Sequence, residues 1–199
     1  NMITVVRDDI VPGGTKQRVL ERYLRELGPG EYVYASPAEG YAQVALALTC
    51  RDLGPKYTAH VFVARRKEMH YRTQLAKAAG AKITECAPIP AFSVLTARAR
   101  EYVSHEAWTA GRKTSKPWVK LLPFGLDDKR FKELMVEVVR EGVGPVSPAE
   151  VWCTVGSGTL IRCLQQVWPN AKFRAVQVGH KADIGKAKRY IAPEPFSRR

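Results

Sequence analysis

Residues 150–166 constrain the fold of this chain most, because they combine a short apolar run, a glycine-rich turn and a helical pattern. Val151–Val155 is bounded by proline and glycine, which predicts a short buried strand. Four apolar residues then recur at helical spacing: Leu160, Ile161, Leu164 and Val167. A helix is therefore expected to begin near Thr159.

Between this strand and helix lies the sequence Gly156-Ser157-Gly158-Thr159. Such a turn leaves backbone N–H groups exposed at a helix N-terminus, where the helix dipole favours a negative charge. The pattern fits a phosphate-binding loop made of these four residues. It fits equally a tight strand–helix turn with a threonine cap, and the local sequence leaves both interpretations open.

The rest of the chain alternates strand and helix patterns. Further strands are expected at Met2–Val6, Glu31–Ala35, Thr58–Ala64, Lys82–Cys86, Trp118–Pro123 and Phe173–Val178. Apolar runs without alternation are typical of parallel sheets covered on both faces. The sequence therefore predicts an α/β fold with largely parallel sheets and helices on both faces. We expect one compact α/β unit over residues 1–199, either undivided or with a small subdomain over about residues 36–115 inserted in the remainder.

No segment suggests a metal site, a disulfide framework or a membrane span. The four histidines lack metal-ligand spacing, so we expect no metal, and the four widely spaced cysteines are interpreted as reduced core residues. No long apolar run and no export signal is present, which predicts a soluble, cytoplasmic protein. Residues 179–199 are basic and contain proline, and we expect them to be loosely packed.

A net charge of +13 is the main anomaly of the composition. It favours an anionic partner, either nucleic acid or a phosphorylated metabolite, although a merely basic soluble surface has the same composition. The candidate nucleic-acid contacts are Arg65, Arg66, Lys67, Lys181, Lys186 and Lys188.

Lys16 follows the turn Pro12-Gly13-Gly14 and falls in the first turn of a predicted helix, which Thr15 is expected to cap. The positive end of the helix dipole disfavours a lysine there. Such a conflict with local preference indicates a functional role, whereas the alternative is an ordinary lysine exposed to water.

Two distant motifs resemble one family. Residues 7–18, with Gly13-Gly14-Thr15-Lys16-Gln17-Arg18, resemble the segment that carries the cofactor lysine in fold-type II pyridoxal-phosphate (PLP) enzymes. The similarity is greatest to the aminocyclopropane-carboxylate deaminase and D-cysteine desulfhydrase branch of the tryptophan synthase beta superfamily, where Gly-Gly-Asn-Lys-x-Arg begins a helix. Residues 154–159 resemble the cofactor-phosphate loop of that family. The shared order of motifs covers roughly residues 5–180.

The resemblance implies a truncated fold-type II protein, a compact phage-type relative, that binds PLP through Lys16 and the loop Gly156, Ser157, Gly158 and Thr159. Ser36-Pro-Ala-Glu-Gly-Tyr41 takes the place of the family's Ser-x-x-Asn-His loop, so Tyr41 is the candidate for stacking on the cofactor ring. From the resemblance we expect residues 1–199 to contain no counterpart of the family's C-terminal segment that contacts the pyridine nitrogen, so the reaction class stays open.

The implied function is that of a lyase or transferase acting on an amino acid or an amino-acid moiety, including one attached to a nucleic-acid base, as in DNA modification. A homodimer is expected from the family. The alternative is a non-catalytic basic α/β module that binds nucleic acid or a phosphorylated ligand, in which Lys16 has no special role.

Overall fold

The computed structural model describes residues 3–88, 91–110, 118–178 and 181–193. The chain divides into two compact units: unit 1 consists of Asn1–Val6 and Gly125–Arg199, and unit 2 of Arg7–Phe124. The subdomain expected over residues 36–115 lies within unit 2. Within the described ranges, no helix is both long and apolar enough to cross a membrane.

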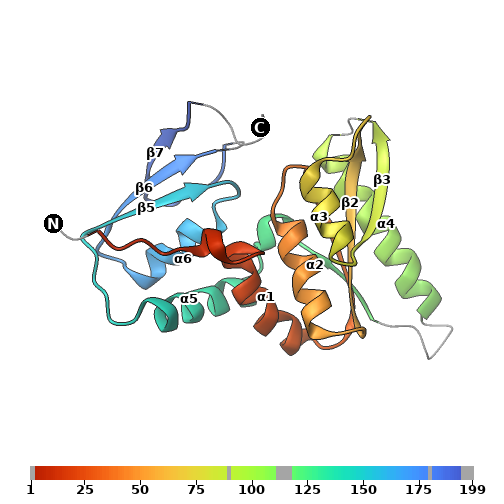
Figure 1. Ribbon diagram of the computed structural model, residues 1–199, viewed down its shortest axis with the longest axis horizontal. Helices are drawn as coiled ribbons and strands as arrows, with labels where there is room; N and C mark the ends of the chain where they lie inside the picture. Colours follow the sequence, from red (N-terminus) through yellow and green to blue (C-terminus); the bar gives the residue numbers. More distant parts are fainter. Residues whose placement is uncertain (1–2, 89–90, 111–117, 179–180, 194–199) are drawn as a thin grey trace. The chain divides into compact units, whose positions relative to one another are not determined.

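Unit 2 contains a four-stranded sheet in the order β3-β2-β1-β4, of which β2 and β3 are labelled in Figure 1. Its strands are β1 (Gly30–Ala35), β2 (Tyr57–Arg65), β3 (Lys82–Pro88) and β4 (Val119–Leu122). Every pairing is parallel. All residues of β1 are buried, as expected for a central strand of a sheet covered on both faces.

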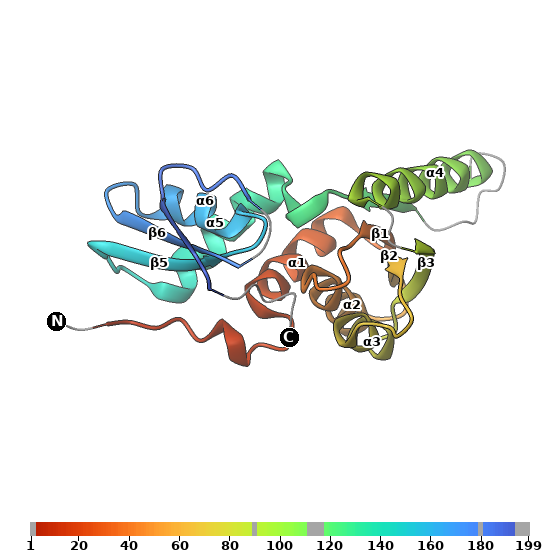
Figure 2. The same cartoon turned by 90° about the horizontal axis from the view of Figure 1, so that it is seen from above.

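Helices cover both faces of this sheet (Figures 1 and 2). The helices α1 (Gly14–Leu27), α2 (Ala42–Leu53) and α3 (Tyr71–Ala78) lie on one side, and α4 (Phe92–Ala110) lies on the other. Leu95 and Ala99 of α4 pack against Val33 and Phe62 of the sheet. The apolar stripe predicted for α1 is confirmed, since its buried residues are Val19, Leu20, Tyr23 and Leu24.

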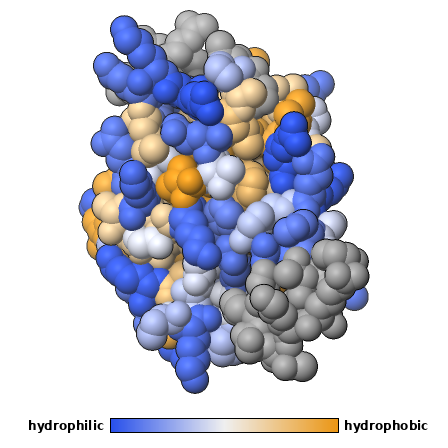
Figure 3. All heavy atoms as spheres, turned by 90° about the vertical axis from the view of Figure 1, so that its right-hand side faces the viewer, coloured by the Kyte–Doolittle hydropathy of each residue, from blue (hydrophilic) through white to orange (hydrophobic). Residues whose placement is uncertain are grey.

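The side of unit 2 seen in Figure 3 is mainly hydrophilic, with hydrophobic side chains in small separate patches. Single exposed apolar side chains of this kind are normal on a protein surface.

Unit 1 is built on the parallel sheet β5-β6-β7, whose strands are β5 (Glu150–Val155), β6 (Lys172–Gln177) and β7 (Lys188–Ile191). Helix α6 (Thr159–Val167) follows β5, and α5 (Lys129–Val143) precedes it. The core of unit 1 includes Val155, Phe173 and Ala175 from the strands and Ile161 from α6. The predicted α/β fold with parallel sheets and helices is therefore confirmed.

Three local predictions are wrong. Residues 3–6 are not a strand: Ile3 and Val5 are 85% and 67% exposed, because the segment has no pairing partner. The C-terminal region expected to be loose contributes β7, and Ile184 is buried in the core of unit 1. The strand Val151–Val155 exists, but its exposure alternates, so only one face of it is buried.

Candidate functional site

The turn that begins α1 is fixed by two glycines. Gly13 is the N-cap residue, and its N–H donates to the Oε1 atom of Gln17 at 2.7 Å. A Cβ at Gly13 would meet the Gln17 side chain and lie 3.0 Å from the Cα of Ala45 in α2. Gly14 has a φ of 64°, which favours glycine. This close approach sets the first turn of α1 against α2.

Lys16 lies in this first turn, as predicted. The residue is half-buried, and within the described part of the chain its amine forms no hydrogen bond or ion pair. Burial lowers its pKa from 10.5 to about 8. Near physiological pH, an amine with a lowered pKa is neutral for a larger fraction of the time than the amine of an ordinary lysine. The neutral amine is the nucleophilic form.

Hydrogen bonds between side chains connect the segment before α1 to the first turns of that helix. Asp8 accepts hydrogen bonds from the Thr15 hydroxyl at 2.6 Å and from Nε of Arg18 at 3.0 Å. The prediction that Thr15 caps the helix is wrong, because its hydroxyl is used by Asp8 and the cap is Gly13. Arg7 and Asp9 form an exposed ion pair with each other at 2.7 Å.

Tyr41 lies directly before α2 and is 41% exposed. Its hydroxyl donates to the carbonyl oxygen of Pro12 at 2.8 Å, so it is tied to the turn that precedes Lys16. The guanidinium of Arg72 lies 5.6 Å from the centre of its ring, a cation–π distance. Unit 2 thus places the candidate ring-stacking residue beside the start of the helix that carries the candidate lysine.

Arg72 is a residue that the sequence pattern does not single out. It lies in the first turn of α3, where its guanidinium is 5.3 Å from the Tyr71 ring as well, and it donates to the carbonyl oxygen of Glu39. Arg66 pairs with the carboxylate of Glu39. These contacts order the loop 36–41 from outside, and only the tertiary structure brings them together.

The loop between β5 and α6 leads into the N-terminus of a helix through two glycines. Gly158 is the N-cap residue of α6 with a φ of 83°, and a Cβ there would overlap the carbonyl oxygen of Asp183. Among the described residues, none accepts a hydrogen bond from the backbone N–H groups of residues 156–159. Free N–H groups at the start of a helix are suited to a phosphate.

The shape of this loop depends on Thr159 and Gly125. Thr159 is fully buried, and its hydroxyl donates to the carbonyl oxygen of Gly125 at 3.0 Å. Gly125 has a φ of 69°, and a Cβ there would lie 2.6 Å from the Cβ of Ser157. The hydroxyl of Ser157 is half-buried and lies 3.3 Å from that of Thr159. The donors expected to face an anion are therefore backbone N–H groups and the Ser157 hydroxyl.

Lys16 belongs to unit 2 and the loop 156–159 to unit 1. Each part separately fits the group that its motif implies: an unpaired amine of lowered pKa for the aldehyde, and a glycine-lined set of N–H donors for the phosphate. Their joint action on one cofactor stays a prediction.

The candidate nucleic-acid residues are distributed over both units. Arg65 ends β2, Arg66 and Lys67 follow it, and all three are exposed. Lys181, Lys186 and Lys188 are exposed residues of unit 1. Lys186 donates to the carbonyl oxygen of Pro169, and Lys188 lies 5.5 Å from the centre of the Tyr190 ring. Three further basic residues, Arg112, Lys113 and Lys116, lie outside the described residues.

A buried polar network was not predicted from the sequence. The Nδ1 atom of His60 lies 2.8 Å from Oε1 of Glu31, and its Nε2 atom lies 2.7 Å from the Thr84 hydroxyl. Tyr102 of α4 donates to the same Glu31 oxygen at 3.0 Å. Burial raises the pKa of Glu31, but the hydrogen bonds from His60 and Tyr102 and the charge of Lys82 outweigh it, so its pKa lies below the ordinary value. The network joins three strands to α4.

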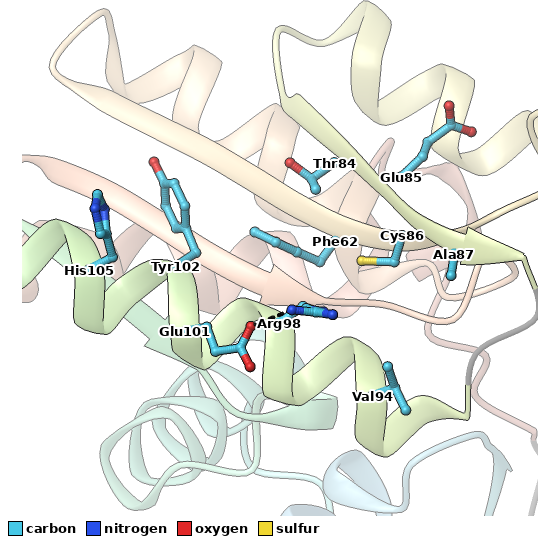
Figure 4. A pocket seen from close by; sticks show the side chains of 10 residues that line it. All are labelled: Phe62, Thr84, Glu85, Cys86, Ala87, Val94, Arg98, Glu101, Tyr102 and His105. Carbon is cyan, nitrogen blue, oxygen red and sulfur yellow. Dashed lines mark hydrogen bonds and ion pairs between the residues drawn. The ribbon is translucent and has the colours of Figure 1, made fainter.

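Thr84 and Tyr102 also line a cavity of about 500 Å³ beside α4 (Figure 4). Its other walls include Phe62 and Cys86, and at its rim Arg98 forms an ion pair with Glu101 at 2.9 Å. Because these charges neutralise each other and the network is internally bonded, we interpret this region as structural support for α4.

The fold is that of the fold-type II pyridoxal-phosphate enzymes, so the resemblance found in the sequence is confirmed for the fold. One similar solved structure is an aminocyclopropane-carboxylate deaminase homologue, with a TM-score of 0.69, 18% identity, and coverage of 89% of this chain and 56% of that chain. Threonine deaminase isoform 2 from Solanum lycopersicum has a TM-score of 0.60 at 17% identity, with coverage of 86% and 45%. Diaminopropionate ammonia lyase from Escherichia coli has a TM-score of 0.56 at 12% identity, with coverage of 89% and 53%.

At these identities the similarity establishes the fold alone, and the chain spans about half the length of the solved structures that it matches. No protein-family model and no curated protein matches the sequence.

Proposed function

We propose that this chain binds pyridoxal phosphate and acts on an amino acid or an amino-acid moiety. The observation that carries the proposal is the amine of Lys16, which is unpaired within the described residues and whose pKa burial lowers to about 8. It occurs at the start of the first helix of a fold-type II fold, at the position that the sequence motif assigns to the cofactor lysine. A desolvated lysine is suited to condensation with an aldehyde.

The residues have separate roles. Lys16 holds the aldehyde end of the cofactor, and the backbone N–H groups of Gly156–Thr159 with the Ser157 hydroxyl hold its phosphate. Tyr41 contributes an aromatic face beside the ring. When bound, the cofactor withdraws electrons from the α-carbon of an amino acid, and the protein supplies binding and orientation.

The net charge of the protein narrows the class of substrate that we propose. With a net charge of +13, the chain attracts polyanions, which supports an amino-acid moiety attached to a nucleic-acid base as one substrate class. A lyase or a transferase reaction is compatible with the site. We include in this proposal a reaction on an amino-acid moiety that is attached to DNA.

The test is the absorption spectrum of the protein mixed with pyridoxal phosphate, followed by borohydride reduction and mass spectrometry of the peptides. We expect a visible band and a covalent adduct on Lys16. Lys16→Arg keeps the positive charge but should lose both signals, whereas Lys77→Ala, which removes an exposed helical lysine, should keep them. Absence of the adduct in the unmodified chain, or labelling that persists in Lys16→Arg, would refute the proposal in favour of a non-catalytic binding module.

A further inference from the structure

Among the described residues, no helix covers one face of the sheet of unit 1. The opposite face carries Val155, Phe173 and Ala175, which form a core with Ile161 of α6. In Figure 1, α5 and α6 lie together below the three strands. Trp152, Arg174 and Lys188 are in register across β5, β6 and β7, so their side chains leave the sheet on the same, uncovered side.

We define the aromatic–basic face as Trp152, Lys172, Arg174, Lys188 and Tyr190. Trp152 is 58% exposed, a large value for a tryptophan within a strand. The centre of its ring lies 5.3 Å from the centre of the Tyr190 ring, and the angle between the two ring planes is 32°. Two aromatic rings are thus held side by side on the exposed face of the sheet.

The sequence pattern indicates that this face is exposed to water or contacts a polar partner. Exposure alternates along β5 and β6, whereas every residue of β1 in unit 2 is buried. A sheet face that another layer of helices covers would carry a continuous apolar surface. Here the positions around the two rings are Glu150, Thr154, Lys172, Arg174 and one apolar residue, Val176. A helix with an apolar stripe could not cover the three charged residues without leaving charges unpaired.

The rings are held in place before any partner binds. The indole N–H of Trp152 donates to Oε1 of Glu150 at 2.7 Å, and Arg174 donates to the other oxygen of that carboxylate at 3.0 Å. Arg174 also donates to the Tyr190 hydroxyl at 3.4 Å. Glu150 therefore neutralises Arg174 and fixes both aromatic side chains, so less ordering is required on binding.

Two lysines of the face, Lys172 and Lys188, form no ion pair within the described residues, and both are exposed. The charge of Lys172 nevertheless acts on Glu150, its neighbour in strand register. Lys188 lies 5.5 Å from the centre of the Tyr190 ring. Aromatic rings flanked by exposed cations match a ligand that carries flat bases along a chain of phosphates.

We propose that the aromatic–basic face binds single-stranded nucleic acid, with bases stacked on Trp152 and Tyr190 and phosphates near Lys172 and Lys188. Bases of a duplex are already stacked on each other, so only unpaired bases are available to these rings. The net charge of +13 attracts the strand from a distance. This inference does not depend on the cofactor, because every residue of the face belongs to unit 1 and Lys16 to unit 2.

The test is fluorescence anisotropy of a labelled oligothymidylate of about twelve nucleotides, a length within the range that one small domain covers. Trp152→Ala should weaken binding at least about fivefold, and Trp152→Phe should restore most of it, because stacking on one ring is worth about 1–3 kcal/mol. The double variant Lys172→Ala/Lys188→Ala should reduce the slope of log affinity against log salt by about 1.4. Lys77→Ala, which removes a charge in unit 2, is the control and should do neither.

Circular dichroism of each variant checks that its fold is intact. Lys16→Ala should bind the oligonucleotide with the same affinity as the unmodified chain, and this result would separate the inference from the proposed cofactor function. Three results of the binding measurement would overturn it: no binding at low salt, equal affinity of the unmodified chain and Trp152→Ala, or a duplex bound as tightly as the single strand. A dimer of the free chain that is lost in Trp152→Ala would also overturn it and identify the face as an interface between copies.

Discussion

The hydroxyl of Tyr41 donates a hydrogen bond of 2.8 Å to the carbonyl oxygen of Pro12, 29 residues earlier in the chain. This bond joins the loop 36–41, which carries the candidate ring-stacking residue, to the turn before Lys16. Tyr41→Phe removes the bond and keeps the ring. We expect the free energy of unfolding to fall by only about 0.5–1.5 kcal/mol, measured by urea denaturation.

The same variant separates two roles of Tyr41. If the ring contacts the cofactor, Tyr41→Phe should retain pyridoxal-phosphate affinity better than Tyr41→Ala. Equal retention by both variants would remove Tyr41 from the cofactor site.

Lys16 is expected to reduce stability at neutral pH. Burial disfavours its charged form, so the penalty is complete below about pH 8 and disappears as the pH rises toward 10.5, where the unfolded lysine also loses its proton. The difference between 10.5 and about 8 corresponds to at most about 3 kcal/mol. Lys16→Met should therefore be more stable than the unmodified chain at about pH 7, and the advantage should shrink at about pH 10. Lys77→Met is the control, and an equal effect of both substitutions would contradict the prediction.

Gly158 and Gly156 are expected to respond differently to substitution. Gly158→Ala requires a positive φ of 83° and overlaps the Asp183 carbonyl, whereas a Cβ at Gly156 meets nothing within 4 Å. The strained conformation alone costs about 1–2 kcal/mol in the alanine variant. Thermal unfolding should show a loss for Gly158→Ala and little change for Gly156→Ala. Gly156→Val, which fills the open space beside the N–H groups, is consequently the cleaner variant for testing phosphate binding in an intact fold.

Glu31 should make unit 2 sensitive to acid. Its pKa is lower in the folded protein than in the unfolded chain, so its contribution to stability is present above the ordinary value of 4.5 and is lost as the pH falls further. Glu31→Gln removes the carboxylate that lies against His60 and accepts from Tyr102, and polar groups left without a good partner cost about 1–3 kcal/mol, so the variant should be destabilised at neutral pH. Urea unfolding at several pH values should show a weaker acid dependence in Glu31→Gln than in the unmodified chain. An unchanged acid dependence would mean that Glu31 does not interact with His60 as the structure shows.

The four cysteines should differ in reactivity. Burial raises the pKa of Cys50 and Cys153 to about 12 and that of Cys163 to about 11, so these thiols stay protonated. Cys86 is half-buried, and the charge of Arg98 opposes the rise in its pKa. Titration of the native protein with a disulfide reagent should modify Cys86 first, and Cys86→Ser should abolish this fast phase. A fast phase that persists in Cys86→Ser would mean that a buried thiol becomes exposed.

Most of the regular structure could be predicted because apolar runs and glycines mark where it begins and ends. The strand predicted at Glu31–Ala35 is found at Gly30–Ala35, and α6 begins at Thr159 as predicted. The strand β7 could not be predicted, since two of its four residues are charged and it exists only through pairing with β6. Residues 3–6 show the reverse case: they are apolar enough for a strand but lack a partner.

The candidate site was predictable only where its chemistry is local. The lysine in the first helical turn and the glycine-rich loop each occupy a few consecutive residues. The network of Glu31, His60 and Thr84 joins residues 24 to 29 positions apart, which become neighbours only through strand register. The contacts of Arg72 with Tyr41 and Glu39 have the same origin.

The bond between Thr159 and Gly125 has a consequence for protein engineering. The loop 156–159 is held by the turn Phe124–Leu126, where Gly125 leaves room for Ser157 and Leu126 has a φ of 58°. Transplanting the strand, loop and helix of residues 150–167 into another scaffold would therefore move the anion donors without their anchor. A working graft would have to carry both segments, together with the spacing between them.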